Sequence, residues 1–115
     1  MEFTDSIKNN YEFRRLYAKG RSAATSRLVL YCRRNRTGHE NHLGITVGTK
    51  IGKAVVRNRI RRRLREIYRT NEKRFAPGYD IVIVARGKSR ISEYRELEDD
   101  LVRLAGKLGL LADAI

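Results

Sequence analysis

A short apolar run at residues 79–85 constrains the fold of this chain more than any other feature. The run reads Tyr-Asp-Ile-Val-Ile-Val-Ala, follows Ala76, Pro77 and Gly78, and ends before Gly87. A continuous run of this length, rich in β-branched residues and bounded by turn residues, is typical of a strand buried inside a sheet. We therefore expect a central strand here, with other strands beside it.

Two earlier segments have the alternating pattern of strands. Residues 27–33 carry apolar side chains on both sides, so we expect both faces of this strand to be covered. A polar connection at residues 34–42 leads into a second strand at Leu43, Ile45 and Val47, and a hairpin is the simplest interpretation.

Three segments have the three- and four-residue spacing of amphipathic helices. The first starts with Asn10 as its expected cap and stops at Gly20; the second runs from Lys53 to about Arg74. The third follows Ser92, its expected cap. The predicted order is αββαβα, with or without a short extra strand near residues 21–24, and the whole chain, residues 1–115, reads as a single domain.

The net charge of the chain indicates which class of molecule it binds. The chain has 26 Lys and Arg against 13 Asp and Glu, giving a net charge of +13, and such a field favours nucleic acid. An anionic membrane is the alternative partner, but no apolar stretch approaches the roughly 20 residues of a spanning helix.

Because the first ten residues lack the apolar core of a secretory signal, we expect a cytoplasmic protein. Cys32, the only cysteine, is expected to pack in the core.

The second helix carries the charge in an ordered way. At about 100° per residue, its apolar positions share one side, Asn58, Arg62, Arg65 and Arg69 lie opposite, and further arginines flank both sides. Only Glu66 supplies a carboxylate among residues 53–69, although like charges four residues apart repel. The planar guanidinium group of arginine can donate two parallel hydrogen bonds to a phosphate, so we expect this helix to bind RNA.

The sequence contains no grouping of residues that predicts a catalytic site in the protein itself. His39 and His42 lie in a polar segment without spaced cysteines, so we expect them to be exposed and not metal ligands. The acidic run at residues 98–100 reads as a solvated face, and residues 48–52 lack the spacing of a nucleotide-binding loop. We therefore expect no catalytic residue, no metal site and no cofactor bound by the protein itself.

The segment Lys50-Ile-Gly-Lys-Ala-Val-Val-Arg-Asn-Arg-Ile-Arg-Arg62 resembles the hallmark helix of the bacterial ribonuclease P protein family. Residues 10–19, 27–31 and 80–86 fit the family's order, so the likeness covers nearly the whole chain. The resemblance implies an α/β (α+β) two-layer sandwich of about four mixed strands and three helices, similar to ribosomal protein S5 domain 2, with a left-handed βαβ crossover.

The resemblance also implies two RNA-binding surfaces. A cleft between the first helix and the sheet would hold the 5′ leader of precursor tRNA. The residues expected in this cleft are Phe13, Tyr17, Val29 and Tyr31. The residues alone leave open whether Phe13 lines the cleft or belongs to the core. Family members often carry a cleft aromatic near the C-terminus, where this chain has Leu108-Gly109-Leu110-Leu111. The catalytic RNA would contact the basic helix, and the residues expected to do so are Lys50, Lys53, Arg57, Asn58, Arg59, Arg61, Arg62, Arg65 and Arg69.

The function implied is that of an accessory subunit of an endoribonuclease. The partners would be one ribonuclease P RNA per protein and precursor tRNA, not DNA or a membrane, and Mg²⁺ in the RNA holoenzyme would support hydrolysis. The other class that the residues allow is a pure RNA-binding module, such as a ribosomal protein or RNA chaperone. Preference for precursor over mature tRNA, dependent on the leader, separates the two.

Overall fold

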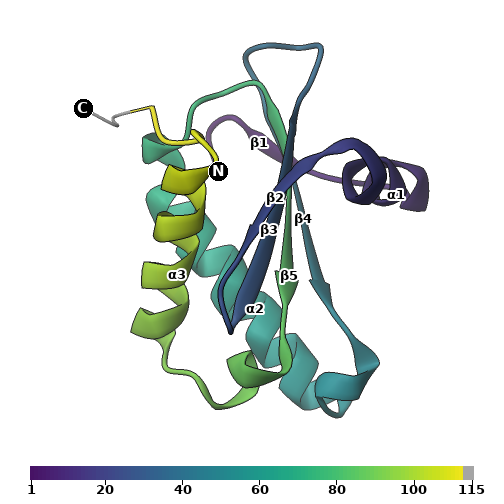
Figure 1. Ribbon diagram of the computed structural model, residues 1–115, viewed down its shortest axis with the longest axis vertical. Coiled ribbons are helices and arrows are strands. Elements are labelled where there is room, and N and C mark those ends of the chain that lie inside the picture. The colour runs from purple at the N-terminus through teal and green to yellow at the C-terminus, as the bar shows by residue number, and fades with distance from the viewer. Residues whose placement is uncertain (113–115) are drawn as a thin grey trace.

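The computed structural model describes residues 1–112, which form one mixed sheet with helices on both faces (Figure 1). The sheet has five strands in the order β1-β4-β5-β3-β2. Helices α2 (Ala54–Asn71) and α3 (Tyr94–Lys107) cover one face, and α1 (Asn10–Lys19) lies on the other. The strands are β1 (Thr4–Ser6), β2 (Arg21–Ala24), β3 (Leu28–Arg34), β4 (Asn41–Val47) and β5 (Tyr79–Ala85). Short 3-10 turns occupy Thr49–Ile51, Glu72–Arg74 and Gly87–Ile91.

Strand β5 is the centre of the sheet, as its continuous apolar run predicts. It pairs antiparallel with β3 and parallel with β4, so that Val82 lies beside Tyr31 on one side and Gly44 on the other. The predicted hairpin between β3 and β4 is therefore wrong, because β5 separates them. The polar connection between β3 and β4 crosses the end of β5 instead, where the Asn35 N–H donates to the Gly78 carbonyl at 2.9 Å.

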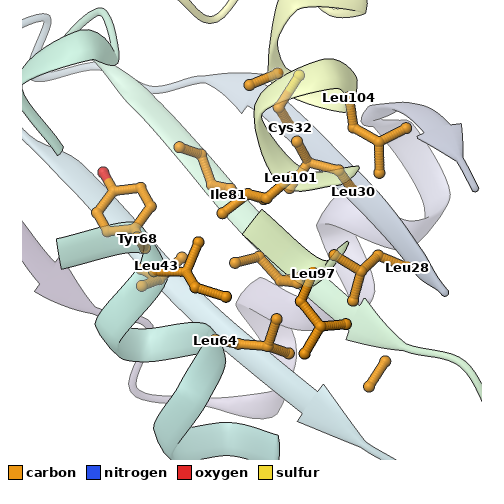
Figure 2. Packing of buried hydrophobic residues seen from close by; sticks show 14 of the residues in the cluster. Leu28, Leu30, Cys32, Leu43, Leu64, Tyr68, Ile81, Leu97, Leu101 and Leu104 are labelled. Atoms are coloured by element: carbon orange, nitrogen blue, oxygen red, sulfur yellow. The ribbon is translucent and has the colours of Figure 1, made fainter. Parts of the chain in front are cut away.

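Both faces of β3 are covered, which confirms the prediction from its two apolar sides. Leu28, Leu30 and Cys32 point toward Leu97, Leu101 and Leu104 of α3 in the main core (Figure 2). On the other face, a smaller cluster of Ile7, Leu16 and Val82 lies under α1, with Phe13, Tyr31 and Val84 packed against it. Cys32 is a buried free thiol, and burial raises its pKa.

The α/β class with three helices is confirmed, whereas the strand count is five and not about four. The strand near residues 21–24 is present as β2. Strand β1 has no sequence signal, because it is three polar residues long; it forms through parallel pairing with β4 and through the Glu72 carboxylate, which accepts hydrogen bonds from the N–H groups of Glu2 and Phe3. The handedness of the β4-α2-β5 crossover stays a prediction.

Both predicted helix caps are one residue away from the observed ones. The Asn9 side chain, not that of Asn10, accepts the Glu12 N–H at 3.0 Å and caps α1. Helix α3 starts with a reciprocal capping box between Glu93 and Glu96. The Ser92 hydroxyl instead donates to the Lys88 carbonyl at 2.7 Å, so it closes the preceding 3-10 turn. In the described part of the chain, no helix is both long and apolar enough to span a bilayer.

Candidate nucleic-acid interface

Helix α2 presents the basic face that its sequence predicts. Ile60, Leu64, Ile67 and Tyr68 are buried against the sheet and α3, and the four positions opposite them are exposed. The amphipathic burial of one side fixes the helix and leaves the other side free to meet a polyanion. The exposed set is Asn58, Arg62, Arg65 and Arg69.

The arginines on the flanks of α2 are half-buried and held by backbone carbonyls. Arg57 donates to the Gly52 carbonyl at 3.1 Å, Arg59 to the Arg90 carbonyl at 3.1 Å, and Arg63 to the Ser92 carbonyl at 3.3 Å. A carbonyl orients the guanidinium group without neutralising its charge. Arg59 also has a buried Nε–H without a partner among the described residues. The flanks are thus positioned but still cationic.

Glu66 distinguishes Arg69 from the other exposed arginines. Its carboxylate accepts hydrogen bonds from both Nε and an Nη of Arg69, and this pairing lowers the pKa of Glu66. Arg62 and Arg65 have no carboxylate within 4.0 Å in the described part of the chain. Lys50, in a 3-10 turn, and Lys53, which immediately precedes α2, are exposed at the N-terminal end of the helix.

A cleft of about 550 Å³ lies between α1 and the edge of β4, and it contains two of the four predicted cleft residues. Phe13 and Tyr17 line it from α1, one turn of helix apart. Tyr17 is 40% exposed, and its hydroxyl is hydrogen-bonded to that of Thr46 on β4 at 3.0 Å. An aromatic face beside open space is the arrangement on which an unstacked base can pack.

Phe13 belongs to both the cleft and the packing under α1. Its ring lies on Gly44 of β4: a Cβ at that glycine would come within 2.5 Å of the ring. The ring also packs against the small apolar cluster that contains Leu16 and Val82. The absence of a side chain at position 44 therefore lets the helix approach the sheet closely enough to form the cleft wall.

The other two predicted cleft residues lie on β3. Tyr31 packs edge-on against the Tyr17 ring, with 4.9 Å between the centroids, and supports it from β3. Val29 is half-buried on the same face of β3. Neither lines the cleft itself.

Six further residues line the cleft, and nothing in the sequence indicates that they lie together. Among them, Arg61 best shows how the cleft is related to α2. It extends from α2 to the edge of β4, donates to Asn58 Oδ1 at 2.9 Å and lines the cleft opposite Phe13 and Tyr17. The basic helix and the aromatic cleft therefore form one continuous surface. The periodicity of α2 places Arg61 on a flank, but only the fold shows which cavity that flank borders. The other lining residues are Asn10, Arg14, Ile45, Thr46 and Val47.

The histidine prediction is only half correct. His39 is exposed, but His42 is partly buried, with Nδ1 2.7 Å from Asp80 Oδ1 and Nε2 2.8 Å from Glu40 Oε1. Burial lowers the pKa of His42, but the hydrogen bonds and charges of Asp80 and Glu40 outweigh it, so the pKa is raised. No group of three or more metal-binding side chains that could hold an ion occurs within residues 1–112.

The acidic run of α3 is partly structural and not wholly a solvated face. Asp100 is buried and accepts a hydrogen bond from the Thr25 hydroxyl at 2.8 Å, with Arg27 at 3.5 Å. Glu98 accepts from Asn71 at 3.0 Å, and Asp99 is exposed. Asp100 thus ties α3 to the connection between β2 and β3, and Glu98 ties it to α2.

The C-terminal leucines lie away from the cleft. Leu108 and Leu110 are buried in the main core, on the α2 and α3 side of the sheet, and the Leu110 carbonyl accepts the Ala76 N–H at 2.7 Å. Within the described residues, this segment contributes nothing to the cleft beside α1.

Comparison with known proteins gives one consistent result. The family model described as Ribonuclease P matches residues 1–109. The ribonuclease P protein component of Clostridium botulinum (strain Langeland) is 40% identical over 107 residues, covering 92% of this chain and 96% of the relative. That of Alkaliphilus metalliredigens is 38% identical over 112 residues, covering 97% and 100%.

Solved structures of the same class share the fold. The RNase P protein of Staphylococcus aureus superposes with a TM-score of 0.84 at 30% identity, covering 92% of this chain and 96% of that one. The RNase P protein of Thermotoga maritima gives a TM-score of 0.78 at 28% identity, covering 85% and 92%.

Proposed function

Because the chain belongs to the ribonuclease P protein family, we propose that it binds the catalytic RNA of that tRNA-processing enzyme through α2 and holds the 5′ leader of precursor tRNA in the cleft beside α1. The observation that carries this proposal is the position of Arg61, which belongs to the basic helix and also lines the aromatic cleft. A single surface can therefore contact both RNAs where they meet.

Helix α2 is suited to the backbone of a folded RNA. Its exposed face offers Arg62 and Arg65, which form no ion pair within the described residues, and its flanks add guanidinium groups that neutral carbonyls hold in place. Arginine donates two parallel hydrogen bonds to phosphate and stays charged at any working pH. Close packing of RNA near a reaction centre concentrates negative charge, and this face would offset part of it.

The cleft is suited to a single strand of varying sequence. Tyr17 offers a half-exposed ring supported by Tyr31, while Arg14 and Arg61 line the same cavity and would meet phosphates. Stacking on an aromatic ring is tolerant of sequence because every base has a flat face. A leader that differs between precursor tRNAs can be held in this way.

We propose that the protein and the catalytic RNA have different roles in the reaction. It would contribute binding and charge neutralisation, and the RNA, with its Mg²⁺, would carry out hydrolysis. One protein per catalytic RNA is the stoichiometry we propose, with precursor tRNA and not DNA as the substrate.

The cleft is tested by replacing Tyr17 in the holoenzyme assembled with ribonuclease P RNA. Tyr17→Ala should weaken binding of precursor tRNA by about 5- to 100-fold, because one base–ring stack is lost, and should leave mature tRNA binding unchanged. Tyr17→Phe is the matched control: it keeps the ring, loses the hydroxyl bond to Thr46, and should bind as the unaltered protein does. Equal losses for both RNAs, or no loss, would contradict leader binding in the cleft.

A further inference from the structure

A second cavity, of about 370 Å³, lies on the opposite side of α1 from the cleft, between that helix, the end of β3 and the loop that follows it. Four arginines from three different elements line it: Arg15 of α1, Arg33 and Arg34 of β3, and Arg36 of the loop. We call it the arginine pocket. It shares no lining residue with the cleft that contains Phe13 and Tyr17.

The arginine pocket is cationic because its four arginines outnumber its two carboxylates, those of Glu12 and Asp80. None of its four arginines has a carboxylate within 4.0 Å in the part of the chain that the structure describes. Asp80, which also lines the pocket, accepts hydrogen bonds from His42 at 2.7 Å and from Asn35 at 3.2 Å. Glu12 lies in the first turn of α1, where a carboxylate is favoured by the helix dipole.

Arg33 gives independent evidence that the pocket suits an anion. It is half-buried and lies directly beside Asp80 in the register of β3 and β5, yet it forms no ion pair with that residue. Its Nη1 is buried and has no hydrogen-bond partner among residues 1–112. A buried charged donor without a partner is costly, and a small movement of the Arg33 side chain would let an anionic oxygen in the pocket accept a hydrogen bond from it.

The loop beside the pocket is held in one conformation. Asn35 Oδ1 accepts the N–H groups of Thr37 at 3.1 Å and Gly38 at 3.3 Å, and Asn35 Nδ2 donates to the Glu40 carbonyl at 2.8 Å. This network fixes the backbone on both sides of Arg36, so the loop itself needs little ordering when an anion binds.

An exposed aromatic ring completes the site. Tyr11 of α1 lines the pocket and is 61% exposed, with the Arg15 guanidinium 5.7 Å from its ring centroid. A ring beside several guanidinium groups matches one nucleotide unit, which has a flat base and a phosphate.

We propose that the arginine pocket binds a phosphodiester group of RNA, with the neighbouring base against Tyr11. This inference rests on the proposed function and adds a site that the basic helix and the aromatic cleft do not supply. The phosphate can come from the precursor tRNA or from the catalytic RNA, and the two sources give different results in the test below.

The test uses the double variant Arg15→Gln/Arg36→Gln, because both side chains are exposed and their loss should not disturb the core. Arg103→Gln is the matched control, since it removes an exposed arginine from α3 on the other face of the sheet. Affinities for ribonuclease P RNA, and of the assembled holoenzyme for precursor and mature tRNA, are measured across a series of salt concentrations. The double variant should lose about tenfold or more in one of these affinities, with a log–log salt slope smaller by roughly one.

The affinity that falls identifies the RNA. A loss for precursor tRNA that grows with leader length assigns the pocket to the leader, and a loss in assembly with ribonuclease P RNA assigns it to that RNA. If the double variant matches Arg103→Gln in every affinity, the proposal is overturned. That result is distinct from failure of the proposed function, which would appear as no effect of the unaltered protein on precursor cleavage.

Arg33→Met provides a second readout that a purely structural arginine would not give. Because the variant removes a buried donor without a partner, its midpoint of thermal unfolding without RNA should not fall, while its RNA affinity should fall as in the double variant. A lower midpoint with unchanged RNA affinity would show that Arg33 only stabilises the fold and would contradict its role in phosphate binding.

Discussion

At the scale of single residues, His42 lies between two carboxylates and makes the stability of the fold depend on pH. Burial disfavours its charged form, but hydrogen bonds from the ring to Asp80 and Glu40 favour that form more, so the folded pKa lies above the ordinary value. A raised folded pKa stabilises the protein fully below the unfolded pKa of about 6.5, and this contribution is lost as pH rises through the folded value.

The free energy of urea unfolding should therefore fall as pH increases above about 6.5, and His42→Gln should remove this part of the pH dependence. His39→Gln is the matched control, because His39 lies three residues away, is exposed and, among residues 1–112, forms a side-chain hydrogen bond only with the Thr37 carbonyl. A pH profile of His42→Gln that parallels the unaltered protein would show that the Asp80–His42–Glu40 arrangement does not contribute.

The sequence alone could not predict that His39 is exposed whereas His42 is partly buried, because the surroundings of His42 depend on distant residues. His42 acquires its environment from Asp80, 38 positions later, which reaches it only because β5 pairs with β4. Asp100 is similar, since Thr25, 75 positions away, makes it a buried acceptor. Local polarity predicts exposure for both residues, and long-range pairing overrides it.

At the scale of elements, the contact between α1 and the sheet depends on Gly44. The Phe13 ring occupies the space that a side chain there would fill, so Gly44→Ala should lower the free energy of unfolding by about 1 to 3 kcal/mol through overpacking. The displaced ring should also weaken precursor tRNA binding by the holoenzyme.

Gly48→Ala is the control for this variant. Gly48 has φ of −67°, and a Cβ there meets nothing within 4 Å, so the substitution should leave stability unchanged or slightly higher. Urea unfolding of both variants gives the comparison. If Gly44→Ala is as stable as Gly48→Ala, close approach of Phe13 to the sheet is not what fixes α1.

Periodicity predicted the elements well but not their neighbours. The burial of Ile60, Leu64 and Ile67 and the exposure of Arg62 and Arg65 follow directly from the spacing within α2. The pairing of β5 between β3 and β4 does not, because the alternation of a strand indicates its faces and not its partners. Strand β1 is too short and polar to carry a signal of its own.

At the scale of the whole molecule, the net charge of +13 is distributed over several separate surfaces. Helix α2 on one face of the sheet, the cleft beside α1 and the arginine pocket on the far side of α1 each present arginines. The total charge predicts a nucleic-acid partner, but only the fold brings Arg61 to the cleft and separates the cleft from the arginine pocket. Binding of RNA should accordingly weaken steeply with added salt.

We propose above all that this protein assists a catalytic RNA and does not itself cut precursor tRNA. The most direct measurement is cleavage of precursor tRNA at low Mg²⁺ by a bacterial ribonuclease P RNA, with the protein, without it, and with the protein alone. We expect cleavage to increase when protein and RNA are combined, and no leader removal by the protein alone. Leader removal by the protein alone would contradict an accessory role, and an equal rate with and without the protein would favour a pure RNA-binding module.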